Sequence, residues 1–331
     1  MHKELHTIKV IRDYMTTKGD LPKHTENIDS VYKFFKEIEK SKKFNSLYIL
    51  NYIYNYISCD EVSKRKTSSR VFEDLLAIIF NGSITDELNR ENDVADVPEC
   101  FENVRDKIAG NKREKIDLLF NGMYGISVKT LVGTNREINL GSFEKKVLFD
   151  GLSVEQYLTE RQASNKEEVG LGSRKQLLKL FKLLQKEGLY QKFSRKFIQM
   201  YEYIFSDDMI LGIKKGEKLT LYFFTGGEFT DLVTSRAENP ENLLEVVNRW
   251  EGNSIRINRV KLLESASRQV QLNFDVLDET VIKLVNDFDF KLHKTYVDYC
   301  NNEKSGDILK MDLIKDLDGL FDKFETEEGL R

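Results

Sequence analysis

The sequence predicts an α/β fold in which a central mixed β-sheet is flanked by helices, with additional helical segments. Short apolar or alternating runs next to turn residues are typical of strands, and they occur at 115–131, 209–224 and 269–277. Longer runs with apolar residues at helical spacing occur before and between them, most clearly at 68–80 and 174–186. Helices and strands that follow one another in this order indicate a sheet covered by helices.

Length and composition are those of an ordinary globular chain. The 331 residues are 40% hydrophobic and 32% charged, enough for one large domain or two modest ones. Cys59, Cys100 and Cys300 lie far apart without a CxxC pair, which argues against a disulfide framework, a zinc ribbon or a thiol redox site. The start of the chain lacks an apolar leader, and the apolar stretch 47–59 is interrupted by asparagines and too short to span a bilayer. We expect a cytoplasmic protein.

The N-terminal part is predicted to be helical. Apolar residues at helical spacing occur in 28–40 and 44–57, within a helical segment of residues 1–60. The run SSRVFEDLLAIIF at 68–80 is a further helix, and the hydroxyl residues at 67–69 are typical of a helix start.

The stretch KIDLLFNGMYGISVKTL at 115–131 predicts two strands joined by a turn. Asn121, Gly122 and Gly125 are turn-type residues. Asp117 in the first strand and Lys129 in the second each have apolar neighbours. Burying either charge alone would cost several kcal/mol, so each requires a partner.

The register of this hairpin decides whether the two charges meet. Asp117 directly opposite Lys129 leaves residues 122–124 as a three-residue loop and places both side chains on one face. A two-residue loop of 122–123 would place them on opposite faces, unless a bulge intervened.

The chain after this hairpin continues with both kinds of element. The expected elements are a helix within 142–152, basic helices within 160–205, a hairpin of 209–215 and 219–224 around Gly216, a helix at 239–250, a strand at 269–277, and an acidic amphipathic tail from Asn301.

One segment is strongly basic, although the net charge of the chain is −4. Between 174 and 196 a single acid, Glu187, stands against eight basic residues: Arg174, Lys175, Lys179, Lys182, Lys186, Lys192, Arg195 and Lys196. Several of the lysines recur at helical spacing and form a stripe opposite an apolar face. Such a stripe is either a solvated surface or a surface that follows nucleic-acid phosphates.

Two interpretations of Asp117 and Lys129 remain open at this point. They form an internal ion pair, or Asp117 binds a divalent metal ion while Lys129 positions or activates water for phosphodiester cleavage. A lone acid or base contributes about 10²- to 10⁴-fold to a rate, far less than phosphate hydrolysis requires. Phosphate chemistry here would therefore need the metal ion and a second acid to hold it.

Residues 68–150 resemble the PD-(D/E)xK nuclease superfamily, and within it the type II restriction endonucleases. The order of helix, acidic strand, turn, lysine strand and helix is the same. Asp117 stands where the family has its metal-binding aspartate, and Lys129 where it has its lysine. Two departures are Ile116 in place of proline and Ser127 in place of the second acid. The resemblance implies a restriction-endonuclease-like core.

Some members of this superfamily carry an SxK form, with the missing acid on the next helix. By this resemblance we expect Glu144 in SFEKK as the second acid, with Glu137 as its rival and the Val128 carbonyl as a further metal ligand. The alternative interpretation is that Glu144 is an acid in the first turn of a helix and interacts only with the helix dipole. Many members also carry a glutamate on the preceding helix, which Glu73 or Asp74 matches; either is otherwise a solvated helix acid.

Basic residues elsewhere are candidates for DNA contacts, because arginine is the usual reader of guanine. Arg136 lies in a region from which relatives contact bases, but their usual second basic residue is Gly133 here. The other candidates, each of which is equally an ordinary surface residue, are Arg256 and Arg259 together with Arg174, Lys175, Lys179 and Lys182.

The resemblance implies a type II restriction endonuclease that uses Mg²⁺ to hydrolyse double-stranded DNA at a specific short sequence. It further implies a homodimer and a cognate DNA methyltransferase as genetic partner. The alternatives are a repair, recombination or modification-dependent nuclease of the same superfamily, and a non-catalytic nucleic-acid or protein-binding module. We expect a helical segment at 1–60, a nuclease core at 61–235 with basic helices inserted at 160–205, and an accessory region for DNA recognition or dimerisation at 236–331.

Overall fold

The computed structural model describes most of the chain between residues 68 and 273 and parts of both ends. The described residues are 13–14, 16–17, 21–22, 25–41, 68–85, 96–132, 134–158, 169–216, 218–273, 311–312, 314–319 and 322. The helix predicted at 44–57 lies outside these residues, as do Gly133 and most of the expected acidic tail.

The centre of the fold is a mixed six-stranded sheet, which confirms the predicted fold class. Its strands, in spatial order, are β1 (Gly82–Ile84), β2 (Leu118–Phe120), β3 (Tyr124–Val132), β5 (Asp208–Lys215), β6 (Lys218–Phe224) and β9 (Arg268–Asn273). Strands β3 and β5 run parallel, and every other neighbouring pair is antiparallel. A parallel pair requires a crossover, and here the chain makes it through the segment 133–207.

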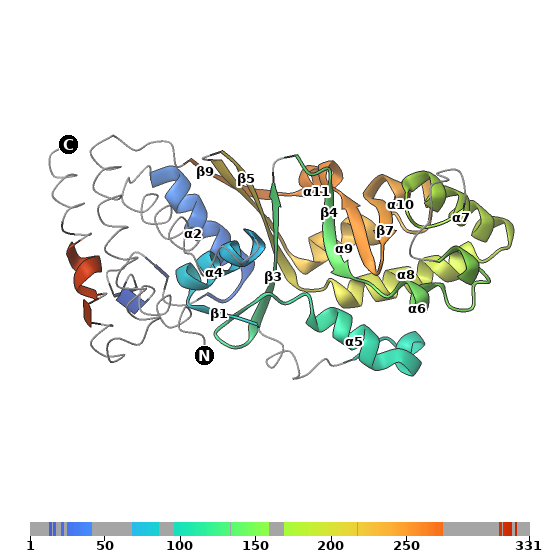
Figure 1. The fold of residues 1–331 in the computed structure, drawn as a ribbon, viewed down its shortest axis with the longest axis horizontal. Helices are drawn as coiled ribbons and strands as arrows, with labels where there is room; N and C mark the ends of the chain where they lie inside the picture. The colour runs from blue at the N-terminus through green and yellow to red at the C-terminus, as the bar shows by residue number, and fades with distance from the viewer. Residues whose placement is uncertain are drawn as a thin grey trace.

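Helices cover both faces of this sheet. Helices α2 (Ile28–Ser41) and α4 (Ser68–Phe80) cover one face, and α8 (Tyr190–Ile204) and α9 (Gly226–Thr234) the other (Figure 1). The two faces follow from the two-residue period of a strand. In β2, β3 and β5, side chains with even numbers, such as those of Leu118, Phe120, Ile126, Val128 and Ile210, enter the core beneath α4. In β3 and β5, side chains with odd numbers, such as those of Leu131, Met209, Leu211 and Ile213, enter the core beneath α8.

A second, three-stranded sheet lies on the α8 side of the molecule (Figure 1). Its antiparallel strands, in spatial order, are β4 (Glu137–Ser142), β8 (Ser254–Asn258) and β7 (Val247–Glu251). The helices near it are α6 (Lys145–Phe149), α7 (Arg174–Lys186), α10 (Pro240–Val246) and α11 (Arg259–Ser265). Short helical elements elsewhere are η3 (Glu99–Val104), α5 (Arg105–Arg113) and η4 (Glu155–Tyr157).

Two predicted helices are shorter than expected. The prediction of a helix over 239–250 is wrong for its C-terminal part, because α10 ends at Val246 and β7 begins at Val247. Pairing with β8 buries Val247 and Trp250, which accounts for the change of conformation. The helix expected within 142–152 is only α6, because Ser142 still belongs to β4.

The hairpin of β2 and β3 has the expected loop length but a different register. Leu118 pairs with Ile126 and Phe120 with Tyr124, so the loop is 121–123 rather than 122–124. Tyr124 belongs to the strand because its ring packs against Phe120 and its hydroxyl donates to Asp208. The shift of pairing is by two residues, so Asp117 and Lys129 still share a face.

The residues of the 121–123 loop suit its backbone conformation. Asn121 and Gly122 have φ angles of 52° and 72°, in the left-handed region that asparagine and glycine adopt at low cost.

Residues on both sides of the expected boundary at 235 contribute to both sheets. Strand β9 completes the six-stranded sheet, and β7 and β8 pair with β4. Helix α2 packs on β9, so the N-terminal segment also joins this core. None of the helices in the described part of the chain combines the length and the apolar character needed to cross a membrane.

Candidate active site

Asp117 and Lys129 meet on one face of the six-stranded sheet. Asp117 precedes β2 directly, and Lys129 lies in β3. Lys129 Nζ is 3.0 Å from Asp117 Oδ2, and the Val128 backbone N–H donates to the same oxygen at 2.7 Å. The two side chains are 14% and 21% exposed, respectively. Each partly buried charge therefore has the partner that its surroundings require.

Ser127 occupies the position of the missing second acid. Its hydroxyl lies 3.5 Å from Asp117 Oδ2, and the residue is buried. The Val128 carbonyl, the further metal ligand that the resemblance implies, accepts a hydrogen bond from Lys129 Nζ at 3.0 Å. The arrangement thus brings one carboxylate, one ammonium group and one hydroxyl together.

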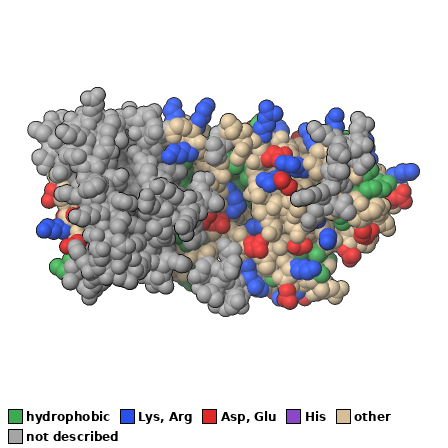
Figure 2. Space-filling view, in the orientation of Figure 1, with side chains coloured by type: hydrophobic (Ala, Val, Ile, Leu, Met, Phe, Trp, Pro, Cys, Tyr) green, Lys and Arg blue, Asp and Glu red, His purple; other side chains and the backbone are tan. Residues whose placement is uncertain are grey.

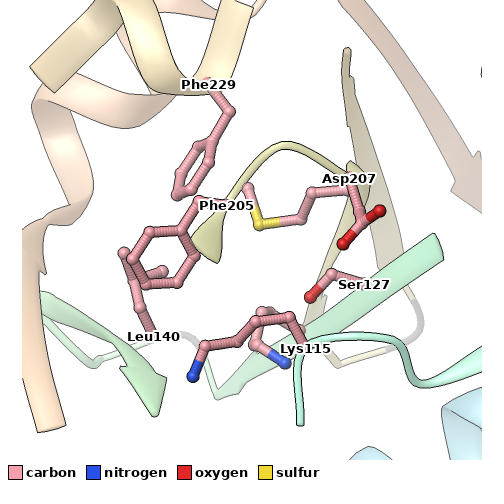
Figure 3. Close-up of a pocket in the computed structure, with 8 residues that line it drawn as sticks. Lys115, Ser127, Leu140, Phe205, Asp207 and Phe229 are labelled. Atoms are coloured by element: carbon pink, nitrogen blue, oxygen red, sulfur yellow. The ribbon is translucent and has the colours of Figure 1, made fainter. Parts of the chain in front are cut away.

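A small pocket adjoins this pair on the same face of the sheet (Figure 3). Its lining residues are Lys115, Ser127, Lys129, Leu140, Phe205, Asp207, Met209 and Phe229. The cavity volume is about 10 Å³, which is room for about one water molecule. The pocket therefore suits a water or an ion, not a nucleotide.

Asp207 brings a second carboxylate to this pocket. It directly precedes β5, and in Figure 3 its carboxylate and the Ser127 hydroxyl face the same space. Asp207 Oδ2 is buried and has no hydrogen-bond partner. Burial raises the pKa of the Asp207 carboxyl; the Lys112 ammonium opposes this effect, and neighbouring Asp208 adds to it.

The sequence pattern does not single out Asp207. In the sequence FSDDMI it is one of two adjacent acids before a strand, which is an ordinary composition for a turn. Only the parallel pairing of β3 with β5 brings this turn beside Ser127.

Lys115 is a second lysine in the pocket, and it is 3% exposed. Its ammonium group donates to the Ser142 carbonyl at 2.7 Å and lies 5.4 Å from the centre of the Phe205 ring. These contacts stabilise its charge in an apolar setting. Lys115 thus adds a second ammonium group to the lining of the pocket, next to that of Lys129.

The two acids that the resemblance implies as second ligand are bonded to residues of the smaller sheet and its turns. The Glu144 carboxylate accepts from Asn253 Nδ2 at 2.9 Å. The Glu137 carboxylate accepts from Arg249 Nε at 3.0 Å and from Asn248 Nδ2 at 3.2 Å. Within the described residues, no three acidic, histidine or cysteine side chains converge as a ready-made metal site. Glu144 and Glu137 are therefore already hydrogen-bonded to side chains of the smaller sheet and its turns.

Glu73 and Asp74 lie on α4, on the other side of the sheet. Helix α4 packs on the face that carries Leu118 and Val128, whereas Asp117 and Lys129 belong to the face that carries Leu131. The Glu73 side chain is half-buried.

The basic residues of α7 form an exposed row. Arg174, Lys175, Lys179 and Lys182 are all exposed, as the predicted stripe requires, and Ser173 caps the helix N-terminus. Helix α7 packs on α8, α10 and β7. On the face shown in Figure 2, blue Lys and Arg side chains alternate with red Asp and Glu side chains and form no single patch.

Part of the basic run has a structural role. Lys196 Nζ donates to the Val147 and Asp150 carbonyls at 2.9 and 3.3 Å, and Lys192 Nζ donates to the Gly151 carbonyl at 3.3 Å. These ammonium groups satisfy carbonyls at the end of α6.

The other arginines proposed to contact DNA differ in their surroundings. Arg136 is exposed in the loop before β4. Arg256 pairs with Glu251 at 2.8 Å, and Arg259 donates to the Asn135 carbonyl at 3.0 Å. Arg256 and Arg259 therefore already hold parts of the second sheet together.

The oxygen atoms at the pocket are of the kind that Mg²⁺ prefers. The Asp207 carboxylate and the Ser127 hydroxyl line the pocket, and the Asp117 carboxylate lies 3.5 Å from that hydroxyl; all three groups are hard donors. A buried carboxylate oxygen without a donor, such as Asp207 Oδ2, is an atom that a bound cation would satisfy. The residues present thus fit a divalent ion.

No protein-family model matches this sequence. No curated protein matches it significantly, and neither does any solved structure. A function must therefore be inferred from the residues and their geometry.

Proposed function

We propose that the chain is a Mg²⁺-dependent endonuclease of double-stranded DNA, acting as a type II restriction enzyme at a specific short sequence. The observation that carries the proposal is the 3.0 Å contact between Lys129 Nζ and Asp117 Oδ2, made by two neighbouring strands of a mixed sheet. The pair, its hairpin and the preceding helix α4 have the order that resembles the PD-(D/E)xK superfamily.

The position of the pair further supports a catalytic role. Both side chains are partly exposed, whereas Leu118 and Val128 in the same strands are fully buried. A structural ion pair needs no exposed edge and no adjoining pocket, but a phosphate can approach only a group that solvent reaches. The pocket has room for a water next to Lys129.

The protein groups have separate roles in this proposal. The Lys129 ammonium orients a water or a non-bridging phosphate oxygen, and Lys115 adds positive charge at the pocket. The carboxylate of Asp117 would hold a divalent ion, which would supply charge neutralisation at the scissile phosphate. Water adds to phosphorus as the bond to the 3′ oxygen breaks, and that oxygen takes up a proton. The product keeps a 5′ phosphate, as the resemblance implies.

The small volume of the cavity limits where a DNA phosphate could bind. A volume of about 10 Å³ excludes a nucleotide, so the backbone phosphate would lie at the exposed edge of Asp117 and Lys129, outside the pocket. The duplex would then be held by more distant basic residues, for which the exposed row on α7 and Arg136 are candidates.

A homodimer in the cytoplasm completes the proposal. Two identical sites related by a two-fold axis cut both strands of a palindrome in the simplest way. A methyltransferase of the same specificity, encoded nearby, would protect the host DNA.

Incubation of the purified chain with phage or plasmid DNA and Mg²⁺, followed by electrophoresis, tests this proposal. We expect reproducible fragments that are lost on chelation of the metal. Cutting that requires methylated DNA would indicate the modification-dependent alternative. DNA binding without cutting would instead favour a binding module with a purely structural Asp117–Lys129 pair.

A further inference from the structure

One carboxylate oxygen at the pocket beside Lys129 is shielded from solvent, although its side chain is partly exposed. This atom, Asp207 Oδ2, has no donor within ordinary hydrogen-bonding distance, and Lys112 is its ion partner. Leaving a charged group unsatisfied costs more than leaving a neutral one, so such an atom in a native fold calls for an explanation.

Lys112 does not satisfy this oxygen. Its Nζ lies 3.7 Å from Asp207 Oδ2, which is beyond hydrogen-bonding distance. The same ammonium group instead donates to the Tyr203 carbonyl at 3.1 Å and to the Ser206 hydroxyl. Lys112 therefore offsets part of the Asp207 charge through a long ion pair and leaves room for a closer partner at this oxygen.

Strand pairing directs Asp207 to the face that carries Asp117 and Lys129. In the parallel pair of β3 and β5, Ser127 is aligned with Met209. Ser127, Lys129 and Met209 line one pocket, and Asp207, two residues before Met209, lines it too. Ser127 in turn lies 3.5 Å from Asp117 Oδ2, so it stands between the two acids.

The acids expected from the sequence are less suited to this position. The Glu144 carboxylate is bonded to Asn253, and the Glu137 carboxylate forms an ion pair with Arg249. Neither residue lines the pocket, whereas Asp207 does.

We infer that Asp207 is the second metal-binding acid of the site and takes the role that Ser127 leaves open. This inference rests on the proposed function, because it assumes that Asp117 binds a divalent ion. The second carboxylate thus comes from the strand parallel to β3, rather than from β3 itself or from the helix that follows it.

Calorimetric titration of the full-length chain with Mn²⁺, in the absence of DNA, tests this role directly. We expect Asp207→Asn and Asp117→Asn each to weaken Mn²⁺ binding by about tenfold or more, because each removes a carboxylate donor. Glu144→Gln and Glu137→Gln should change it less than about twofold. The exposed Asp231 on α9 gives a matched control, and Asp231→Asn should bind as the wild type does.

Moving the carboxylate provides a second, independent test. The double variant Ser127→Asp, Asp207→Asn restores an acid beside Asp117 while it removes Asp207. We expect this variant to recover most of the Mn²⁺ affinity that Asp207→Asn loses. A protein damaged by misfolding would not recover in this way.

Thermal unfolding of the metal-free protein separates a metal-binding role from a structural one. Asparagine has the shape of aspartate without its charge, so Asp207→Asn should unfold at the same temperature as the wild type or a higher one. A lower unfolding temperature would show that Asp207 serves mainly as the ion partner of Lys112, and would overturn the inference.

The remaining outcomes distinguish this inference from the proposed function. Wild-type Mn²⁺ affinity in Asp207→Asn, together with its loss in Asp117→Asn, overturns the role of Asp207 and leaves the nuclease proposal standing. Loss of Mn²⁺ affinity in Glu144→Gln but not in Asp207→Asn also overturns the role of Asp207, and it favours Glu144 as the second acid. A wild-type chain that neither binds Mn²⁺ nor cuts DNA overturns both.

Discussion

At the scale of single residues, the Asp117–Lys129 contact follows from a simple requirement. Two charges among apolar strand residues must find partners, and the nearest one for each is the other. This contact is what the alternating pattern of 115–131 predicts. The position of Asp207 does not follow in the same way, because it is 78 residues beyond Lys129 in the sequence and reaches the pocket only through strand pairing.

Substitution of the pair itself gives the first prediction. Asp117→Asn and Lys129→Met should each lower Mg²⁺-dependent DNA cutting by about 10²-fold or more, because each removes a group that acts on the phosphate or its metal ion. The measurement is the initial rate of plasmid cutting. The exposed Lys146 on α6 supplies a control, since Lys146→Met should cut at the wild-type rate. Full cutting by either site variant would eliminate this site.

The same pair should also contribute to stability. Lys129→Met leaves the Asp117 carboxylate with the Val128 N–H but without its ammonium partner. We expect a loss of about 2 kcal/mol in the free energy of unfolding, the range for hydrogen bonds to charged groups. Urea unfolding measures it. A double variant, Asp117→Asn with Lys129→Met, should lose less than the sum of the two single losses, and strict additivity would show that the ion pair carries no energy.

At the scale of elements, the start of α9 is fixed by a capping box. The Thr225 hydroxyl accepts from the Glu228 N–H, and the Glu228 carboxylate accepts from the Thr225 N–H. This helix supplies Phe229 to the pocket, so its position affects the site. Thr225→Ala should lower the free energy of unfolding by about 1 kcal/mol, as measured in urea. Thr225→Ser retains the hydroxyl and should lose much less; equal losses would contradict a capping role.

Helix α9 also contains a carboxylate, that of Glu228, whose contribution to stability depends on pH. Burial raises the pKa of Glu228, but hydrogen bonds from the Thr225 N–H, Ser267 and Arg268 outweigh it and hold the pKa below its usual range. A lowered pKa in the folded state means that Glu228 contributes stability above its unfolded pKa, and that this contribution is lost as pH falls through the folded value. Glu228→Gln should therefore be less stable than the wild type at neutral pH, and the difference should shrink toward pH 3. Unfolding curves across this pH range measure it, and a constant difference would contradict the assignment.

Element prediction succeeded where one pattern dominated and failed where two overlapped. Helices α4 and α7 and the hairpin of β5 and β6 follow from apolar periodicity and from Gly216. The stretch 239–250 is different, because Asn239 and Pro240 start a helix while Val247 and Trp250 are also suited to a strand. Pairing with β8 decided between them, and that pairing lies outside any local window.

At the scale of the whole molecule, a negative net charge coexists with one exposed row of basic residues on α7. The chain carries a net charge of −4, yet α7 presents an exposed basic row on the part of the fold that carries the smaller sheet. If DNA crosses the exposed edge of Asp117 and Lys129, a row of this kind would bind its phosphates and orient the duplex.

Neutralising this row should weaken DNA binding without changing the site. The triple variant Lys175→Gln, Lys179→Gln, Lys182→Gln should bind cognate DNA less tightly. The slope of its affinity against salt concentration, both on logarithmic scales, should be shallower by about 0.9 for each phosphate that the variant no longer neutralises. Fluorescence anisotropy in Ca²⁺ at several salt concentrations measures both quantities. Lys107→Gln, at an exposed lysine on α5, serves as the control. An unchanged salt dependence would assign the α7 row to solvation alone.

The sequence by itself determined the local periodicity of most strands and helices, the hairpin that joins Asp117 to Lys129, and the need of those two charges for each other. These follow from interactions among neighbours in the chain. The tertiary structure decided the second sheet, the end of α10, and the arrival of Asp207 beside Ser127. Those features depend on which strands pair across the 133–207 crossover. Since backbone hydrogen bonds between strands are the same for many sequences, only the packing of the complete fold selects among the possible pairings.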